Sequence, residues 1–282
     1  MEVVRAKNLG FCAGVKNAMN VLDSAYQKAI ELNLPCYVYG DIVHNAHVVG
    51  ALKERGIVKI NSAEGVPCGV VVIRTHGITD SKRQEFESAG FVLIDATCPV
   101  VLRNQGLVRS SDKPVVIIGY PGHSEVVSLL GSGKNVAAVV SKPEELSHLD
   151  KNLCYNGVVQ TTFSSSELED ILKQAESMGI VINTMNDICA SSQLRRIGVR
   201  SLKNKVDTML VVGDRKSANS NELVAVAKSC GMESFLVESA DKIPAEVFSC
   251  VKIGLTAGAS TPSFVYDEVE AVLRGDFDGR YK

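Results

Sequence analysis

The stretch VVIIGYPGHSEVVSLL, residues 115–130, contains the pattern that decides the fold. It begins with four β-branched residues in a row, passes through a turn rich in glycine and proline, and continues with residues that favour a helix. An uninterrupted apolar strand of this kind is typical of a parallel sheet that helices cover on both faces. Similar strands at Val70–Ile73 and Thr208–Val212 each run into a polar turn. The sequence therefore predicts an α/β protein built from parallel sheets.

Short apolar runs alternate with segments of helical periodicity along the rest of the chain. We predict strands at Cys36–Tyr39, Val70–Ile73, Val92–Ile94, Val115–Ile118, Val136–Val140, Val158–Gln160, Ile180–Ile182, Thr208–Val212, Ser234–Val237 and Val251–Leu255. We predict helices at Val15–Leu32, Asp80–Ala89, Ser124–Leu130, Ser166–Met178, Ser220–Cys230 and Pro262–Leu273. Open α/β sheets bind ligands beyond the carboxyl ends of their strands, so functional residues are expected in the turns that follow the strands.

The composition excludes several classes of protein. The 282 residues are 45% hydrophobic and 22% charged with a formal net charge of −2, which is typical of a packed globular protein rather than a nucleic-acid-binding one. No apolar stretch is long enough to span a bilayer, and the first residues lack the features of a secretory signal, so we expect a cytoplasmic protein. The eight cysteines should stay reduced there, which favours metal binding or catalysis over disulfides.

Three cysteines stand out because each lies in a short turn before a helical pattern. Cys12, Cys98 and Cys189 are 86 and 91 residues apart, close to a third of the chain length. The spacing suggests three α/β modules, residues 14–97, 98–189 and 190–282, that each offer one thiolate to a shared centre. Three thiolates are one short of the four that usually hold an iron–sulfur cube, and such a cube would keep one iron open for chemistry. Taken singly, each cysteine is equally consistent with simple packing. The other five cysteines lie in or beside apolar patterns and are expected to act as small buried hydrophobes.

Histidines and one carboxylate occupy similar turns. His44, His76 and His123 lie in short turn-like motifs, which favours a functional site over isolated polar packing. His47 is also compatible with packing alone. Glu125 follows His123 by two residues. It is explained either by a favourable contact with a helix dipole or by delivery of protons, if an anionic neighbour raises its pKa.

Two segments rich in hydroxyl and amide side chains are predicted to be helix N-termini. They are Ser217–Asn221 and Gly258–Pro262, with Thr261 as a cap before Pro262. Such N-termini bind phosphate readily, although plain capping explains either segment alone. Together with the histidines they indicate a ligand that carries phosphate. A third cluster of hydroxyls is Thr161-Thr162.

These motifs, taken in order, resemble those of the 4-hydroxy-3-methylbut-2-enyl diphosphate reductase family (the IspH/LytB family). The similarity extends from one end of the chain to the other, and the set of motifs is far more specific than any one of them. The matching segments are Gly10–Val15, Val43–Asn45, Thr75–Gly77, Asp95–Pro99, Gly122–Val126, Gln160–Thr162, Asp187–Cys189, Ser217–Asn221 and Thr256–Ser260.

The resemblance implies a pseudo-threefold trefoil of the three modules around a central [4Fe–4S] cluster. The cluster would have Cys12, Cys98 and Cys189 as ligands and one open iron, and residues 1–13 would join the third module. The resemblance also implies a site for an allylic diphosphate. Its substrate-binding members would be His44, His76, His123, Thr161, Ser217, Ala218, Asn219 and Ser260, of which all but Thr161 would hold the diphosphate.

Within that site the resemblance assigns catalytic roles to Glu125, Thr161 and His123, with Thr162 as the alternative to Thr161. The implied reaction is the reductive removal of the allylic hydroxyl to give isopentenyl and dimethylallyl diphosphate, the terminal step of the non-mevalonate pathway. A ferredoxin or flavodoxin would supply electrons to a monomeric enzyme. One departure is Ala218, where the family usually has serine, so that only the backbone N–H is left to bind the diphosphate at this position.

Two functions of other classes remain open at this point. A redox or iron-sensing regulator would use the same cluster without turnover, but it would not need the histidine, serine and asparagine motifs. A zinc hydrolase would use cysteine and histidine ligands. Iron and sulfide analysis of oxygen-free protein separates these alternatives, because a zinc protein is colourless.

Overall fold

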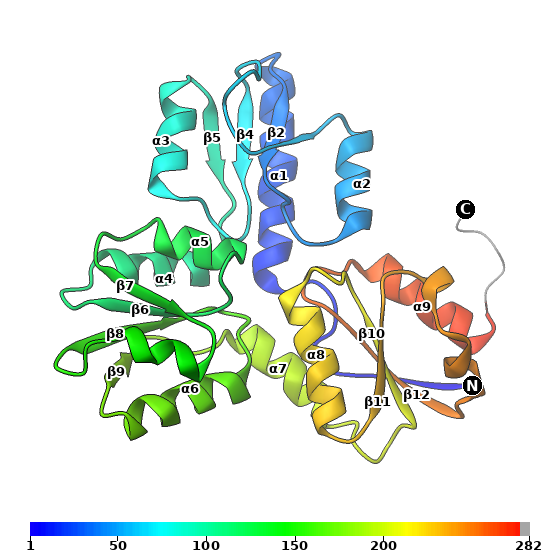
Figure 1. Cartoon of the computed structure of the whole chain (residues 1–282). Coiled ribbons are helices and arrows are strands. Elements are labelled where there is room, and N and C mark those ends of the chain that lie inside the picture. The colour runs from blue at the N-terminus through cyan, green and yellow to red at the C-terminus, as the bar shows by residue number, and fades with distance from the viewer. Residues whose placement is uncertain (277–282) are drawn as a thin grey trace. The chain divides into compact units, whose positions relative to one another are not determined.

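The computed structural model describes residues 1–276. Strands and helices alternate along the chain, and the strands form three four-stranded parallel sheets (Figure 1). Sheet A has the order β1 (Glu2–Arg5), β12 (Lys252–Ala257), β10 (Thr208–Val212) and β11 (Glu233–Val237). Sheet B has the order β3 (Val58–Ile60), β2 (Cys36–Tyr39), β4 (Val70–Ile73) and β5 (Val92–Asp95). Sheet C has the order β7 (Val136–Val140), β6 (Val115–Ile118), β8 (Cys154–Val159) and β9 (Val181–Thr184).

The three sheets share one topology. In sheet B the chain runs from β2 outward to β3, returns to β4 on the other side of β2, and goes on to β5. Sheet C repeats this path from β6 to β9. In sheet A, β10, β11 and β12 repeat the first three strands, and the N-terminal β1 takes the fourth place through its parallel pairing with β12. The prediction of three similar parallel α/β modules is therefore confirmed. Each sheet has a switch point, between β2 and β4, β6 and β8, or β10 and β12, where such folds bind ligands.

Helices cover the sheets because the central strands are apolar on both faces. The strand β6 shows this clearly: Val115 and Ile117 pack into one buried cluster with Leu129, whereas Val116 and Ile118 pack into another with Ile171. The α-helices of the described residues are α1 (Ala13–Glu31), α2 (Ala46–Glu54), α3 (Asp80–Ser88), α4 (Pro99–Arg109), α5 (Ser124–Leu130), α6 (Ser165–Ser177), α7 (Ala190–Arg200), α8 (Ala218–Ser229) and α9 (Ser263–Arg274). No helix within residues 1–276 combines the length and apolar character needed to cross a membrane.

The chain forms two compact units. Unit 1 comprises Met1–Val15, Val43–Val49 and Ala190–Lys282, of which residues 277–282 lie outside the described part, and it contains sheet A. Unit 2 comprises Lys16–Ile42 and Gly50–Cys189, and it contains sheets B and C. The division into three modules with borders at Cys98 and Cys189 stays a prediction.

Candidate active site

The three cysteines occupy equivalent backbone positions. The N–H of each donates a hydrogen bond to the carbonyl oxygen of the second residue after a strand that flanks a switch point, namely β12, β4 or β8. The bonds join Cys12 to Ala259 (3.2 Å), Cys98 to Thr75 (3.0 Å) and Cys189 to Thr161 (3.1 Å). The internal repeat of the fold therefore extends to the turns that carry the thiols. Each acceptor is itself a predicted site residue or the neighbour of one.

All three cysteines lie at helix N-termini. Helices α1, α4 and α7 each begin at the residue directly after a cysteine, and Cys98 is the N-cap of α4. The Val15 N–H, in the first turn of α1, donates to Cys12 Sγ at 3.4 Å. The dipole of a helix N-terminus stabilises negative charge nearby, which suits residues that hold a metal cluster through sulfur. All three cysteines are outside disulfides and partly exposed. These properties fit the donor set of an iron–sulfur cluster.

The structure also bears on whether the chain could bind a single metal ion. No group of three or more His, Cys, Asp or Glu side chains within residues 1–276 is placed to hold one metal ion. A cube distributes its thiolates over different irons and does not need such a compact group. The prediction that the other five cysteines are buried holds only for Cys36, since Cys68 is exposed and Cys154, Cys230 and Cys250 are partly exposed. Cys154 departs from apolar packing because its sulfur accepts from the Asn183 amide at 3.1 Å.

Glu125 and Thr161 form a buried pair in unit 2. Glu125 lies in the first turn of α5, only 1% of it is exposed, and Thr161 lies just beyond β8. The Thr161 hydroxyl donates to Glu125 Oε2 at 2.6 Å, and the Thr161 N–H donates to Oε1 at 2.9 Å. The carbonyl of Thr161 accepts from Cys189, so one residue joins the carboxyl group to the cysteine turn. Thr162 differs, because its hydroxyl accepts from the amide of Gln160 at 2.9 Å.

Burial raises the pKa of Glu125 to about 7, although the two hydrogen bonds from Thr161 act to lower it. Near neutral pH this carboxyl group is therefore present in both its protonated and its ionised form. A group in this state can both give and take a proton under physiological conditions, which is the property required of a general acid.

The raised pKa of Glu125 predicts a pH-dependent local stability. Between about pH 4.5 and 7 the folded state binds the carboxyl proton more tightly than the unfolded state, so stability conferred at low pH is lost as the pH rises through 7. The loss is on the order of 3 kcal/mol. Hydrogen exchange of α5 amides in oxygen-free protein should show Glu125→Gln gaining protection relative to the parent as the pH rises from 5 to 8. A ratio of exchange rates that does not change with pH would contradict this assignment.

Two histidines lie together in unit 2. The rings of His76 and His123 are 5.4 Å apart and nearly perpendicular. His123 is the N-cap of α5, and its Nδ1 accepts from the Glu125 N–H at 3.2 Å. This pattern assigns the proton of a neutral His123 ring to Nε2. The imidazole that caps the helix is thereby oriented to act as a donor through its other nitrogen.

Unit 1 contains the second group of predicted residues. Ser217 is the N-cap of α8, and Ala218 is the first residue of that helix. Asn219 accepts from the Ala259 N–H at 2.9 Å, and the Ser260 hydroxyl donates to the His44 carbonyl at 3.0 Å. These two bonds join the turns after β2, β10 and β12 around the start of α8.

One donor in this group points to a ligand. The Asn219 Nδ2 group is buried and makes no hydrogen bond within residues 1–276. An N–H donor in this position costs free energy unless something accepts from it, and an anionic oxygen at the start of α8 would do so. Gly258 permits the close approach of the turn, since a Cβ there would lie 2.2 Å from Ser220 Oγ.

The prediction for Thr261 is wrong. Pro262, not Thr261, is the N-cap of α9, and it makes no side-chain capping bond. Thr261 is fully buried, and its hydroxyl donates to the Val212 carbonyl at 3.0 Å. It therefore ties the β12 turn to β10 rather than capping a helix.

Sequence reasoning left three supporting residues without a role. Gln160 is buried, accepts from the Tyr120 N–H at 2.9 Å and donates to Thr162, so it fixes the turn that carries Thr161. Its place beside Thr161-Thr162 was the available signal. Gln105 and Ser128 are buried on α4 and α5, and no motif marks them.

The structure brings the predicted residues together in two groups. Unit 1 holds Cys12, His44, Ser217, Ala218, Asn219 and Ser260. Unit 2 holds His76, Cys98, His123, Glu125, Thr161 and Cys189. In each unit these residues lie beyond the carboxyl ends of parallel strands or in turns bonded to those ends.

Fold and site define an α/β protein in which three equivalent strand ends present cysteines beside histidine, hydroxyl and carboxyl groups. The chain belongs to the LytB protein family, whose sequence profile matches residues 3–274. It is 35% identical to 4-hydroxy-3-methylbut-2-enyl diphosphate reductase of Treponema denticola, over 97% of this chain and 99% of the relative. It is 36% identical to the protein of that name from Aeromonas hydrophila, over 97% of this chain and 91% of the relative.

Solved structures show the same similarity. The E-1-hydroxy-2-methyl-but-2-enyl-4-diphosphate reductase of Plasmodium falciparum superposes with a TM-score of 0.90 at 25% identity, covering 96% of this chain and 87% of that one. A second structure, of (E)-4-hydroxy-3-methyl-but-2-enyl diphosphate reductase, the terminal enzyme of the non-mevalonate pathway, gives a TM-score of 0.71 at 28% identity. It covers 97% of this chain and 99% of the other.

Proposed function

We propose that this chain is a 4-hydroxy-3-methylbut-2-enyl diphosphate reductase. Its membership of the LytB family and its near full-length similarity to reductases of that name support the assignment. The observation that carries it is the buried Glu125–Thr161 pair, which lies between the His123 cap and the Cys189 turn. A proton-bearing carboxyl group beside an iron-ligating turn is what reductive loss of a hydroxyl group requires.

The proposed cofactor is a [4Fe–4S] cluster held by Cys12, Cys98 and Cys189. The three reduced thiols at helix starts support this choice. When bound, the cluster supplies single electrons and a Lewis acid. Three protein ligands leave one iron of the cube open, which is why a fourth cysteine is not needed.

The proposed ligand for the two groups of polar residues is the diphosphate of the substrate. The residues that would bind it are His44, His76, His123, Ser217, Asn219, Ser260 and the N–H of Ala218. The unsatisfied Asn219 amide and the start of α8 support this role, because both favour an anion. Binding energy from the diphosphate end would hold the hydroxyl end in place for reaction.

The side chains of Glu125 and Thr161 form the proposed proton path. With Glu125 protonated, its carboxyl O–H can donate to Thr161 Oγ1, and the threonine proton is then available to the substrate hydroxyl. We assign this role to Thr161 rather than Thr162, because only Thr161 contacts Glu125. Overall, two electrons and two protons enter, the allylic C–O bond breaks, water leaves, and a C–H bond forms to give isopentenyl or dimethylallyl diphosphate.

Assay of oxygen-free protein tests the proposal directly. With a chemical electron donor and 4-hydroxy-3-methylbut-2-enyl diphosphate, we expect both product diphosphates, one water for each substrate consumed, and no product without the reductant. Full iron and sulfide content with no reduction of the diphosphate would reject the assignment and favour the sensing role.

The proposal also covers the electron donor, the cellular location and the organisation of the chain. A ferredoxin or flavodoxin would supply the electrons, and the enzyme would act as a cytoplasmic monomer. Residues 1–13 would belong to the third α/β module. The pairing of β1 with β12 supports that last assignment.

A further inference from the structure

Ser128 joins two predicted site residues through their backbones. Its buried hydroxyl on α5 lies 2.7 Å from the His76 carbonyl oxygen and 2.8 Å from the Glu125 carbonyl oxygen, and can donate to either. A serine that donates to a carbonyl of its own helix is common. The contact with His76 is different, because it reaches a segment 52 residues away that follows β4.

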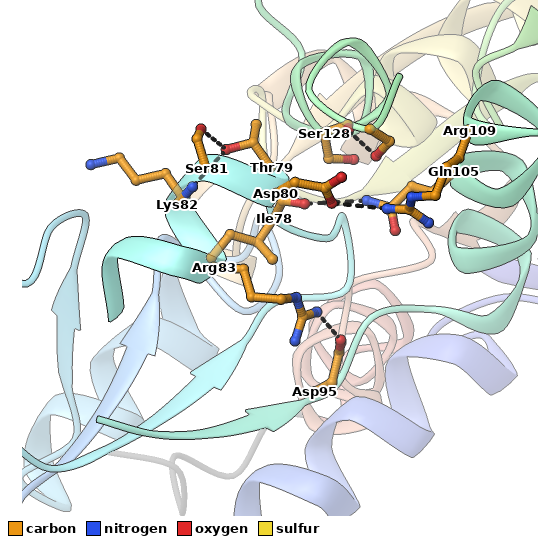
Figure 2. A network of polar contacts seen from close by, with 11 residues as sticks. Ile78, Thr79, Asp80, Ser81, Lys82, Arg83, Asp95, Gln105, Arg109 and Ser128 are labelled. Carbon is orange, nitrogen blue, oxygen red and sulfur yellow. Dashed lines mark hydrogen bonds and ion pairs between the residues drawn. The ribbon is translucent and has the colours of Figure 1, made fainter. Parts of the chain in front are cut away.

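The segment from His76 to Asp80 is held from a second side by α4 (Figure 2). Gln105 Nε2 donates to the Ile78 carbonyl at 3.3 Å, and Arg109 donates to the Asp80 carboxylate at 2.8 Å. The N–H of Asp80 donates to Gly131, directly after α5, at 3.3 Å. Helix α4 begins beside Cys98, and helix α5 begins beside His123. Helix α4, and helix α5 with the residue after it, therefore both form hydrogen bonds with this segment.

Gly77 shows how closely the segment is packed. Its φ of +82° is in the left-handed region, which glycine adopts without strain. A Cβ at this position would lie 2.8 Å from Gln105 Nε2 and 3.3 Å from Ser128 Oγ. The backbone next to His76 therefore lies close to the two side chains that bind this segment.

We propose that Ser128 is a positioning residue for the substrate's diphosphate. Its hydroxyl sets the distance between the turn that carries His76 and the helix that carries His123 and Glu125, so the two imidazole rings meet the anion in a fixed geometry. This inference rests on the proposed function for its substrate. It goes beyond that function by assigning a positioning role to a buried side chain that is not among the proposed substrate-binding or cluster-binding residues.

Helix α5 and the residues after it provide a matched control. Ser132 is also buried, and its hydroxyl donates at 2.6 Å to the Ser128 carbonyl without reaching the His76 segment. Ser128→Ala and Ser132→Ala each remove one buried hydroxyl group from neighbouring turns. We expect Ser128→Ala in the oxygen-free holoenzyme to raise KM for the allylic diphosphate about fivefold, with kcat within about twofold of the parent. Ser132→Ala should leave KM unchanged, and Ser128→Thr, which keeps the hydroxyl, should restore it.

Hydrogen exchange separates this inference from the proposed function. Amides of residues 76–80 should exchange faster in Ser128→Ala than in Ser132→Ala, whatever reaction the enzyme catalyses. Equal KM values in the two alanine variants, or equal exchange of the segment, would overturn the positioning role while leaving the reductase assignment intact. If the unsubstituted chain did not reduce the diphosphate, the proposed function would be rejected. The exchange experiment would still test the contact between Ser128 and the His76 carbonyl.

Discussion

Replacing Glu125 by glutamine is expected to lower kcat by about a hundredfold or more, because general acids contribute rate factors of that size. Glutamine can still accept the Thr161 N–H, and it occupies nearly the same volume, so fold and substrate binding should change little. It cannot carry the proton that the raised pKa of Glu125 keeps available near pH 7. The pH dependence of kcat that belongs to this carboxyl group should disappear with it.

Steady-state kinetics of oxygen-free protein, together with its visible spectrum, measures this effect. Glu145→Gln is the matched control, because Glu145 also accepts backbone N–H bonds, but from Ser141 and Lys142, neither of which is a predicted site residue. The spectrum should be the same in the parent and in both variants. Full turnover in Glu125→Gln would remove this residue from the proton path.

Cys98→Ser should abolish activity by a different route, through loss of the cofactor. The parent is expected to contain about four irons per chain, and the variant little or none. Serine keeps the N-cap position of α4, so the helix should still form while the soft thiolate ligand is lost.

Iron and sulfide analysis with electron paramagnetic resonance tests this expectation. Cys68→Ser provides the control, since Cys68 is exposed and its thiol donates to the Gly90 carbonyl. Circular dichroism should show the same helix content in both variants. Iron content in Cys98→Ser equal to that of the control would reject Cys98 as a ligand.

Much of the fold could be predicted because the central strands carry their own signal. Val70–Ile73 and Val115–Ile118 are continuous β-branched runs that the structure buries on both faces, and their bounds match the prediction. The prediction missed β1 and β3. Both are short edge strands with charged residues, as in Val58-Lys59-Ile60, so they lack an uninterrupted apolar run. A helical pattern was predicted directly after Cys98, and α4 begins there, with Pro99 as its first residue.

The site was predictable to the extent that it follows strand ends. Punctuated turns marked the cysteines, the histidines and Glu125, since a strand, a turn and a helix start are all local features. The hydrogen bond from Ser128 to His76 is not local, and nothing in either segment indicates the other. The Glu125–Thr161 contact is not local either, because the pairing of β6 with β8 is what places the two turns side by side.

The place of β1 in sheet A determines the point during synthesis at which sheet A can be completed. Within the described residues β1 pairs only with β12, so this strand waits for one that is made after sheets B and C. Sheets B and C use neither segment and can form while translation continues. Cys12 gains its backbone partner Ala259 only once β12 is in place. A prosthetic group that needs all three cysteines would therefore be inserted after β12 has been made and paired, not while sheets B and C are forming.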